Sequence, residues 1–274
     1  MNLKYTNTNF PLRYKIQQKT VFTFNGMAIS DTSAEAIWRI DNWKKNNEGY
    51  IVSLTSEKHE TNSNASQMAD LITLMGKFNI PMTDLMIQLN EKGKPIEVLN
   101  QTEIYNKWVG LRDGELSKFK EEEQTNNILI AGDKDYSNTL PIILNSSYYM
   151  LFFPPVYGQK KSSNSKFNKI NLGSTLFQGS NVEINIGENV IGMTDSGISM
   201  NHIGLGCIDD YNKAEKAFND GYKKIVEEPF DYEYRYNADY LYNTNGVLIK
   251  SNAEIQEKAC EKVNLKQTYQ AIVL

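Results

Sequence analysis

The sequence is poor in the residues that most often carry chemistry. Its 274 residues include only two histidines and two cysteines, and these show none of the close spacings that are typical of zinc sites. We therefore expect His59 and His202 to be ordinary surface or core residues. Cys207 lies five residues beyond His202 in a predicted strand, which places the two side chains on opposite faces and argues against a nucleophile and base pair. We expect no catalytic residue of this type, no metal and no cofactor.

Arginine is also scarce. Arg13, Arg39, Arg112 and Arg235 are the only arginines among 29 basic residues, and the formal net charge is −4. Nucleic-acid binding depends on neutralising phosphates and favours the forked contacts of arginine. The composition therefore predicts no nucleic-acid partner, whereas an acidic surface suits a basic protein partner.

Long hydrophobic runs are missing. The longest apolar run covers residues 148–156, far short of the roughly 20 residues that a membrane-spanning helix needs. We expect no transmembrane segment. The N-terminus lacks the apolar stretch of a secretory signal, which predicts a cytoplasmic protein as the sequence is written, or a periplasmic or cell-surface one if a leader precedes it.

Aromatic residues, in contrast, are abundant, with 16 Tyr, 11 Phe and 3 Trp. In residues 230–242 apolar and aromatic residues occupy every even position, which is the period of a strand with one aromatic and one polar face. Asn245-Gly246 then predicts a tight hairpin turn, with residues 247–249 returning as the partner strand. We expect this strand to be a central element of the fold.

The rest of the chain alternates between strand and helix periods. We expect strands over 13–24, 34–44, 50–55, 85–90, 95–99, 182–186, 189–193, 198–205 and 265–274, and helical segments over 66–78, 104–111, 140–144 and 214–225. The prediction is an α+β fold with antiparallel, strand-rich halves at 1–110 and 158–274 and a helical insertion at 111–157. The polar, serine-rich residues 158–168 are the expected linker, and the halves together could form one continuous domain.

The two halves show a local similarity. GKPIEVLNQTEI from Gly93 and GVLIKSNAEI from Gly246 both follow a turn glycine with an apolar strand and a polar cluster, which suggests an internal duplication. A duplicated sheet carrying helices on one face resembles, in outline, the half-barrel of periplasmic lipoprotein carriers. No motif of that family is matched, so the resemblance implies an architecture and no activity.

Asp195-Ser196-Gly197 resembles the Asp-Ser/Thr-Gly loop of aspartic proteases. That chemistry requires two aspartates that share a proton, and the chain contains no second loop of this type. We interpret the three residues as a hairpin turn.

Two aromatic sets are the candidate binding residues. One lies on the predicted aromatic strand and the other in the apolar run of the insertion: Tyr232, Tyr234, Tyr236 and Tyr240, and Tyr148, Phe152, Phe153 and Tyr157. They could line a groove for a hydrophobic ligand or a protein partner, or be covered by helices and form core.

The sequence therefore predicts a binding protein without catalytic activity. Two alternatives stay open. One is a cytoplasmic protein-interaction factor, such as a toxin immunity protein or a secretion adaptor. The other is an enzyme with dispersed carboxylate and tyrosine catalysts.

Overall fold

The dominant feature of the fold is one antiparallel sheet of eleven strands. The computed structural model describes residues 3–6, 9–64, 73–74, 76–117, 123–158, 166–194 and 197–274. The strands are β1 (Leu12–Phe24), β2 (Met27–Lys45), β3 (Gly49–Ser63), β4 (Asp84–Asn90), β5 (Pro95–Val98), β6 (Lys166–Gly173), β7 (Asn181–Thr194), β8 (Gly197–Ile208), β9 (Glu233–Asn243), β10 (Leu248–Cys260) and β11 (Val263–Val273). The α+β class predicted from the sequence is confirmed.

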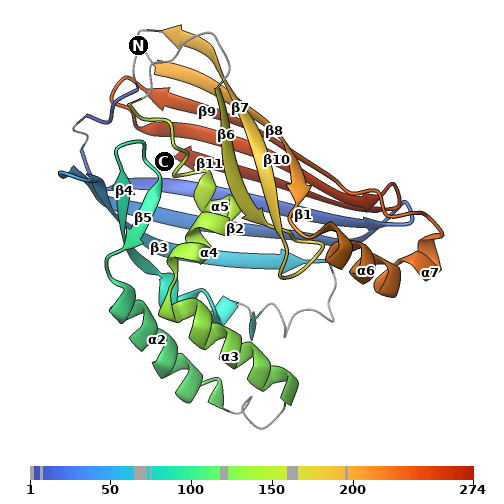
Figure 1. The fold of residues 1–274 in the computed structure, drawn as a ribbon. Helices are drawn as coiled ribbons and strands as arrows, with labels where there is room; N and C mark the ends of the chain where they lie inside the picture. Colours follow the sequence, from blue (N-terminus) through green and yellow to red (C-terminus); the bar gives the residue numbers. More distant parts are fainter. Residues whose placement is uncertain are drawn as a thin grey trace.

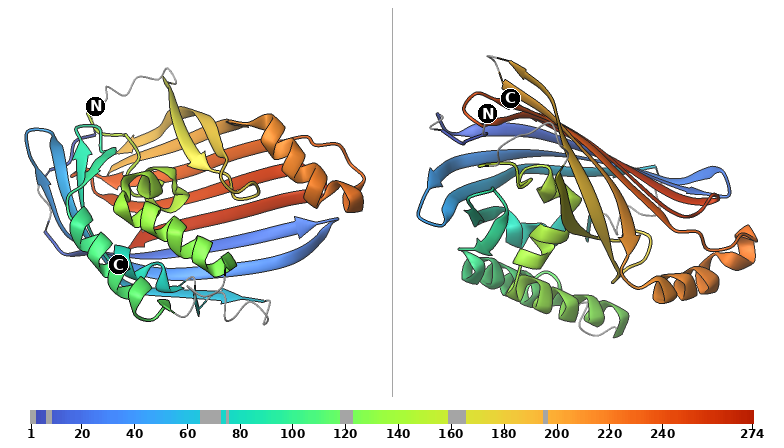
Figure 2. Two further views of the ribbon diagram at one scale, coloured as in Figure 1. Left: turned by 60° about the horizontal axis from the view of Figure 1, so that its bottom comes forward. Right: turned by 45° about the horizontal axis from the view of Figure 1, so that its top comes forward.

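The helices lie against one face of this sheet and at one of its ends. Helices α2 to α5 lie below the curved sheet, and α6 and α7 lie beyond the far ends of the strands (Figures 1 and 2). Their bounds are α2 (Gln101–Asp113), α3 (Glu123–Ser137), α4 (Leu140–Asn145), α5 (Ser147–Met150), α6 (Tyr211–Gly221) and α7 (Lys223–Val226), with a short 3-10 turn η2 at Ile80–Met82. In the described part of the chain, none of them combines the length and apolar character that crossing a membrane requires.

The aromatic strand is confirmed as β9, which starts at Glu233 rather than Phe230. Its even-numbered residues from Tyr234 to Tyr242 are buried and most of the alternate residues are exposed, because successive side chains of a strand point to opposite faces of the sheet. The turn to β10 has Gly246 in the left-handed region at φ 74°, which a glycine adopts without strain.

One pairing joins the two strand-rich halves. The strand order is β5-β4-β3-β2-β1-β11-β10-β9-β8-β7-β6, so neighbours in the sheet are consecutive in the chain except where β1 meets β11. That pair runs from Tyr14 opposite Val273 to Phe24 opposite Val263. The first and last strands of the chain therefore lie at the centre of the sheet, and β5 and β6 form its two edges. Helix α2 crosses the boundary expected after residue 110.

Several strands are longer than the sequence predicted. β3 continues through the polar residues 57–63 because it keeps pairing with β2 as far as Thr32 opposite Ser63, where much of the strand surface is exposed. β7 is one continuous strand over the two strands expected at 182–186 and 189–193. Its register irregularity lies between Val190 and Gly192, inside the second of them. β6 begins at Lys166, inside the expected linker. Most of the helix expected over 66–78, together with Asp195 and Ser196, falls outside the described residues.

The two similar segments adopt different structures. After Gly93, strand β5 ends at Val98 and α2 begins at Gln101, whereas after Gly246 the chain stays in β10 as far as Cys260. This pair of segments therefore gives no support to an internal duplication. The duplication and the half-barrel comparison stay predictions.

Helices α2 and α3 form a small layer with its own tight packing. Trp108 is fully buried, stacks on Tyr136 at 4.8 Å, and donates from Nε1 to Asp133 Oδ1 at 2.7 Å. Gly132 is required at this contact, because a Cβ atom there would lie 2.3 Å from the indole of Trp108. Arg112 also donates to Asp133, so the pair of helices is held by both apolar and charged contacts.

Candidate functional site

The segment from α5 to residue 158 crosses the inner face of the sheet and brings the two aromatic sets together. The Tyr157 backbone N–H donates to the carbonyl of Lys92 at 3.1 Å, and its hydroxyl donates to the carbonyl of Gly246 at 2.8 Å. The Tyr157 ring lies 6.2 Å from that of Tyr242. Tyr157 thereby links the β4–β5 turn in one half of the chain to the β9–β10 turn in the other.

The residues predicted to line an open aromatic groove are mostly core. Their exposed fractions are 3% for Tyr234 and Tyr157, 1% for Tyr236 and Tyr240, and 4% for Phe152 and Phe153, whereas Tyr148 and Tyr232 are half-buried. Covering these rings removes a large apolar area from water, which stabilises the fold by roughly 25 cal/mol per Å². The chain covers its own aromatic face, and the open space lies elsewhere.

A cavity of about 370 Å³ lies between the two edges of the sheet. We call it the edge cavity. One wall is the β4–β5 turn, the opposite wall is β6, and α4, α5 and the following loop lie between them. Its lining residues are Asn90, Lys92, Lys94, Pro95, Ile143, Leu144, Asn145, Tyr149, Met150, Phe153, Pro155, Asn168, Lys169, Ile170 and Asn171.

The edge cavity combines apolar side chains with a basic border. Leu144, Tyr149, Met150 and Ile170 are half-buried and leave part of their apolar surface open, whereas Lys92, Lys94 and Lys169 are exposed. No aspartate or glutamate is among its lining residues. Four asparagines also line the cavity, namely Asn90, Asn145, Asn168 and Asn171. Small-molecule sites usually combine apolar walls with polar groups that fix orientation.

Of the eight aromatic residues predicted as binding residues, only Phe153 lines the edge cavity. The lysines were missed because they lie on strands or turns that are about 75 residues apart in the chain, and only the closure of the sheet around α4 and α5 brings them to one opening. The lysine-rich turn at 91–94 lies between the strands predicted at 85–90 and 95–99, but nothing in its spacing points to a partner at β6.

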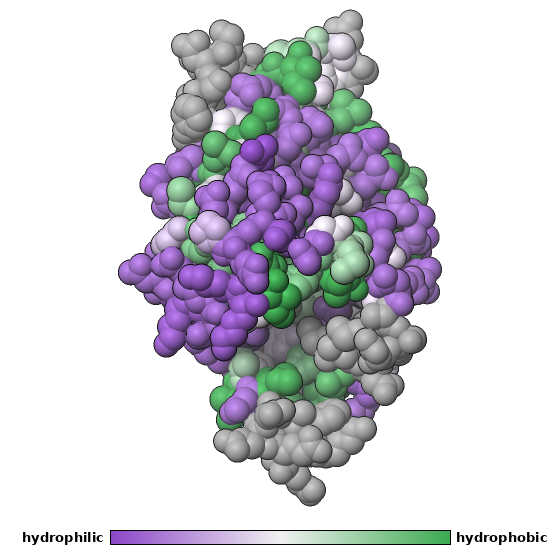
Figure 3. Space-filling model, turned by 90° about the vertical axis from the view of Figure 1, so that its right-hand side faces the viewer, coloured by the Kyte–Doolittle hydropathy of each residue, from purple (hydrophilic) through white to green (hydrophobic). Residues whose placement is uncertain are grey.

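A second cavity of about 260 Å³ lies on the other side of α5. We call it the inner cavity; Trp38, Leu54, Met82, Ile142, Tyr148 and Tyr149 provide its apolar lining, and Gln18, Ser56, His59, Asn79 and Ser146 its polar lining. Tyr149 borders both cavities, and its ring lies 5.1 Å from that of Trp38. Seen from the end at which α6 and α7 lie, the surface is mainly hydrophilic but is hollowed, with hydrophobic residues around the hollow (Figure 3).

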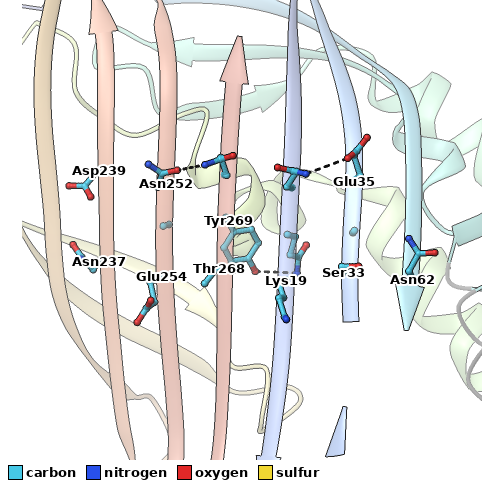
Figure 4. Close-up of a pocket in the computed structure, with 15 residues that line it drawn as sticks. Lys19, Ser33, Glu35, Asn62, Asn237, Asp239, Asn252, Glu254, Thr268 and Tyr269 are labelled. Carbon is cyan, nitrogen blue, oxygen red and sulfur yellow. Dashed lines mark hydrogen bonds between the residues drawn. The ribbon is translucent and has the colours of Figure 1, made fainter. Parts of the chain in front are cut away.

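A third open space, about 640 Å³, lies across the sheet face turned away from the helices (Figure 4). Apart from Ala34, Ala253 and Tyr269, its side chains are polar, and several are paired with one another or with near neighbours. Asn252 accepts from Gln270 at 2.9 Å, and Lys19 pairs with Asp31 at 2.9 Å. We interpret this region as the solvated face of the sheet, because most of its lining side chains are polar and several of these already have partners.

The chemistry-bearing residues are dispersed. His202 is buried with its Nε2 3.5 Å from Glu188 Oε2, and its ring lies 4.9 Å from Tyr240. Cys207 is exposed, so it faces away from His202, as the sequence predicted. Cys260 is buried, and both cysteines are free. Within the described ranges, no group of three or more His, Cys, Asp or Glu side chains is placed to hold a metal ion.

Comparisons with known proteins are sparse. No protein-family model and no curated protein sequence matches the chain. Among solved structures, the chain is similar to lipovitellin in a structure that describes its lipid–protein interactions, with a TM-score of 0.50 and 7% identity over 96% of this chain. The chain spans about a quarter (25%) of the length of that lipovitellin chain. This likeness shows a shared fold and nothing more specific.

Two weaker similarities cover nearly the whole chain. One is to a protein from Bacteroides fragilis that is described as exported and YmcC-like in fold, with a TM-score of 0.29, 9% identity, and coverage of 100% of this chain and 98% of that one. The other is to an outer membrane channel from Pseudomonas putida F1, with a TM-score of 0.22, 6% identity, and coverage of 98% of both chains. Both TM-scores are too low to support a conclusion.

Proposed function

We propose that this protein binds a hydrophobic small molecule in the edge cavity. The observation that carries the proposal is an opening lined on part of its surface by apolar side chains, left between two sheet edges that the chain does not close by strand pairing. Its volume of about 370 Å³ falls within the roughly 300–1,000 Å³ typical of ligand sites. The lipid named for the lipovitellin structure is consistent with a ligand of this class.

The predicted aromatic residues act in this proposal as support rather than as contact surface. Phe153 lines the edge cavity. Tyr157, in the loop that follows Phe153, holds this loop in place through two hydrogen bonds. A site on such a supported segment keeps its shape before the ligand arrives, which lowers the entropic cost of binding.

The direct test is to fill the cavity. Ile170→Trp places a larger side chain at the edge-cavity wall, and we expect it to abolish binding of a neutral apolar dye, phenylnaphthylamine, measured by its fluorescence increase. The matched control is Leu205→Trp, because Leu205 is 64% exposed on β8 and is not among the edge-cavity residues. Circular dichroism and the melting temperature check that both variants fold.

Equal dye binding by the wild type and both variants would place the dye elsewhere and refute the edge cavity as the site. Absence of binding to the wild type would refute the function. As an independent measurement, organic extraction of the protein purified from its native host, followed by mass spectrometry, should release a lipid or fatty acid in stoichiometric amount.

A further inference from the structure

The lysines at the border of the edge cavity point to the chemical class of the ligand. We infer that the cavity binds a single-chain amphiphile with an anionic headgroup, the headgroup at Lys92 and Lys94 and the chain against α4, α5 and β6. This inference rests on the proposed function and specifies its ligand.

The charge distribution at the cavity is the first support. The chain as a whole carries a net charge of −4, yet the edge cavity is lined by Lys92, Lys94 and Lys169 and by no acidic residue. Lys169 is paired with Glu183 at 2.7 Å. Lys92 and Lys94 form no ion pair with another described residue. A bound anion would therefore meet two uncompensated ammonium groups.

The turn that carries these lysines is held in one shape. Asn90 Oδ1 accepts hydrogen bonds from the backbone N–H groups of Lys92 and Lys94, each at 3.0 Å. Gly93 lies between them in the left-handed region at φ 91°, and a Cβ atom there would lie 2.6 Å from the ring of Tyr157. The backbone of the turn is thus fixed against the core, so only the lysine side chains have to be ordered when a ligand binds.

The size and lining of the cavity favour one chain. A volume of about 370 Å³ is at the small end of ligand sites. Leu144, Met150 and Ile170 are half-buried and present apolar surface to the same cavity as the exposed lysines. Each methylene group transferred there from water contributes about 0.8 kcal/mol. Charge at the border and apolar contact inside together select an amphiphile over a purely polar anion.

The test compares ligands that differ only in the headgroup. We expect oleate to bind about fivefold more tightly than oleyl alcohol at low ionic strength, as two exposed charge contacts of about 0.5 kcal/mol each predict. This preference should shrink as salt is added, because exposed charges are screened. Hexanoate, which has the same headgroup and a short chain, should bind much more weakly than oleate.

The variant Lys92→Gln/Lys94→Gln should lower oleate affinity about fivefold and leave oleyl alcohol affinity unchanged. The charge reversal Lys92→Glu/Lys94→Glu should shift the preference towards oleylamine. The matched control is Lys216→Gln/Lys224→Gln, which removes the same charge from exposed positions on α6 and α7 and should alter neither affinity.

The outcomes separate this inference from the proposed function. If oleyl alcohol binds in the edge cavity as tightly as oleate, and the lysine variants change neither affinity, the anionic headgroup is refuted while hydrophobic binding stands. If neither ligand binds the wild-type protein, both proposals are refuted. Loss of oleate affinity in the control variant as well would mean that net charge, not the border lysines, sets the preference, and would also overturn the inference.

Discussion

Three tyrosine hydroxyls around the β9–β10 turn give a sharp test of how the two halves are joined. The Tyr157 hydroxyl donates to the Gly246 carbonyl at 2.8 Å, and the Tyr14 hydroxyl donates to the Leu248 carbonyl at 2.8 Å. The Tyr242 hydroxyl is equally buried but has no hydrogen-bond partner in the described part of the chain. The same Tyr→Phe substitution therefore removes a hydrogen bond at two positions and an unsatisfied group at the third.

The magnitudes follow from what each substitution leaves behind. Tyr157→Phe leaves the Gly246 carbonyl buried without its donor, which costs about 1–3 kcal/mol of the free energy of unfolding. Tyr14→Phe should cost a similar amount for the same reason. Tyr242→Phe removes a hydroxyl that was desolvated without compensation, so we expect a change between zero and a gain of about 1 kcal/mol.

Urea unfolding measured by circular dichroism is the appropriate assay, because the dependence on denaturant should have the same slope in all variants while the midpoint shifts. Each variant serves as a control for the others, since all three lose only one oxygen atom from a buried ring. A Tyr242→Phe variant destabilised as much as Tyr157→Phe, or a neutral Tyr157→Phe, would refute the assignment of these hydrogen bonds.

Three further predictions test the packing and the pH dependence. Gly132→Ala should lose about 1–3 kcal/mol of the free energy of unfolding, because the added methyl group overpacks against Trp108. Gly110→Ala on α2, where a Cβ atom would meet no neighbour, should gain up to about 1 kcal/mol. Thermal unfolding of both variants checks this. The buried carboxylate of Glu257 accepts from two backbone N–H groups and from the Tyr232 hydroxyl, so Glu257→Ala should cost about 3 kcal/mol, and an unchanged urea midpoint would contradict it. Burial raises the pKa of Tyr157, Tyr236 and Tyr242 well above 10, so the folded state retains protons that the unfolded chain releases near pH 10. The free energy of unfolding should therefore be independent of these groups below about pH 10 and should fall as the pH rises above it. Urea unfolding at a series of pH values, with tyrosinate absorbance as the probe of ionisation, checks this.

The aromatic strand shows how much local pattern can predict. The alternation in residues 230–242 and the Asn-Gly turn depend only on the period of a strand and on the backbone freedom of glycine, and both occur in the structure as β9 and its hairpin. Strand lengths were less predictable. β3 and β7 are longer than the strands predicted from their side-chain alternation. Pairing with a neighbouring strand satisfies the backbone hydrogen bonds of residues whose side chains show no alternation.

The site illustrates the opposite case. The predicted aromatic residues have the composition of a binding surface, but their burial depends on the segment at 147–157 returning across the sheet, a contact that joins residues such as Tyr157 and Tyr242 from distant parts of the chain. Lys94 and Ile170 meet at the edge cavity for a similar reason. Neither contact can be predicted from the local periodicity of the sequence.

By itself, the sequence determined that this chain forms an antiparallel, strand-rich α+β fold with an aromatic strand near its C-terminus, because side-chain period and turn chemistry are local properties. The tertiary structure alone decided which aromatic rings became core and which surface stayed open. That choice depends on the β1–β11 pairing and on how far the two sheet edges stand apart, and both are set by contacts between residues that no local pattern connects.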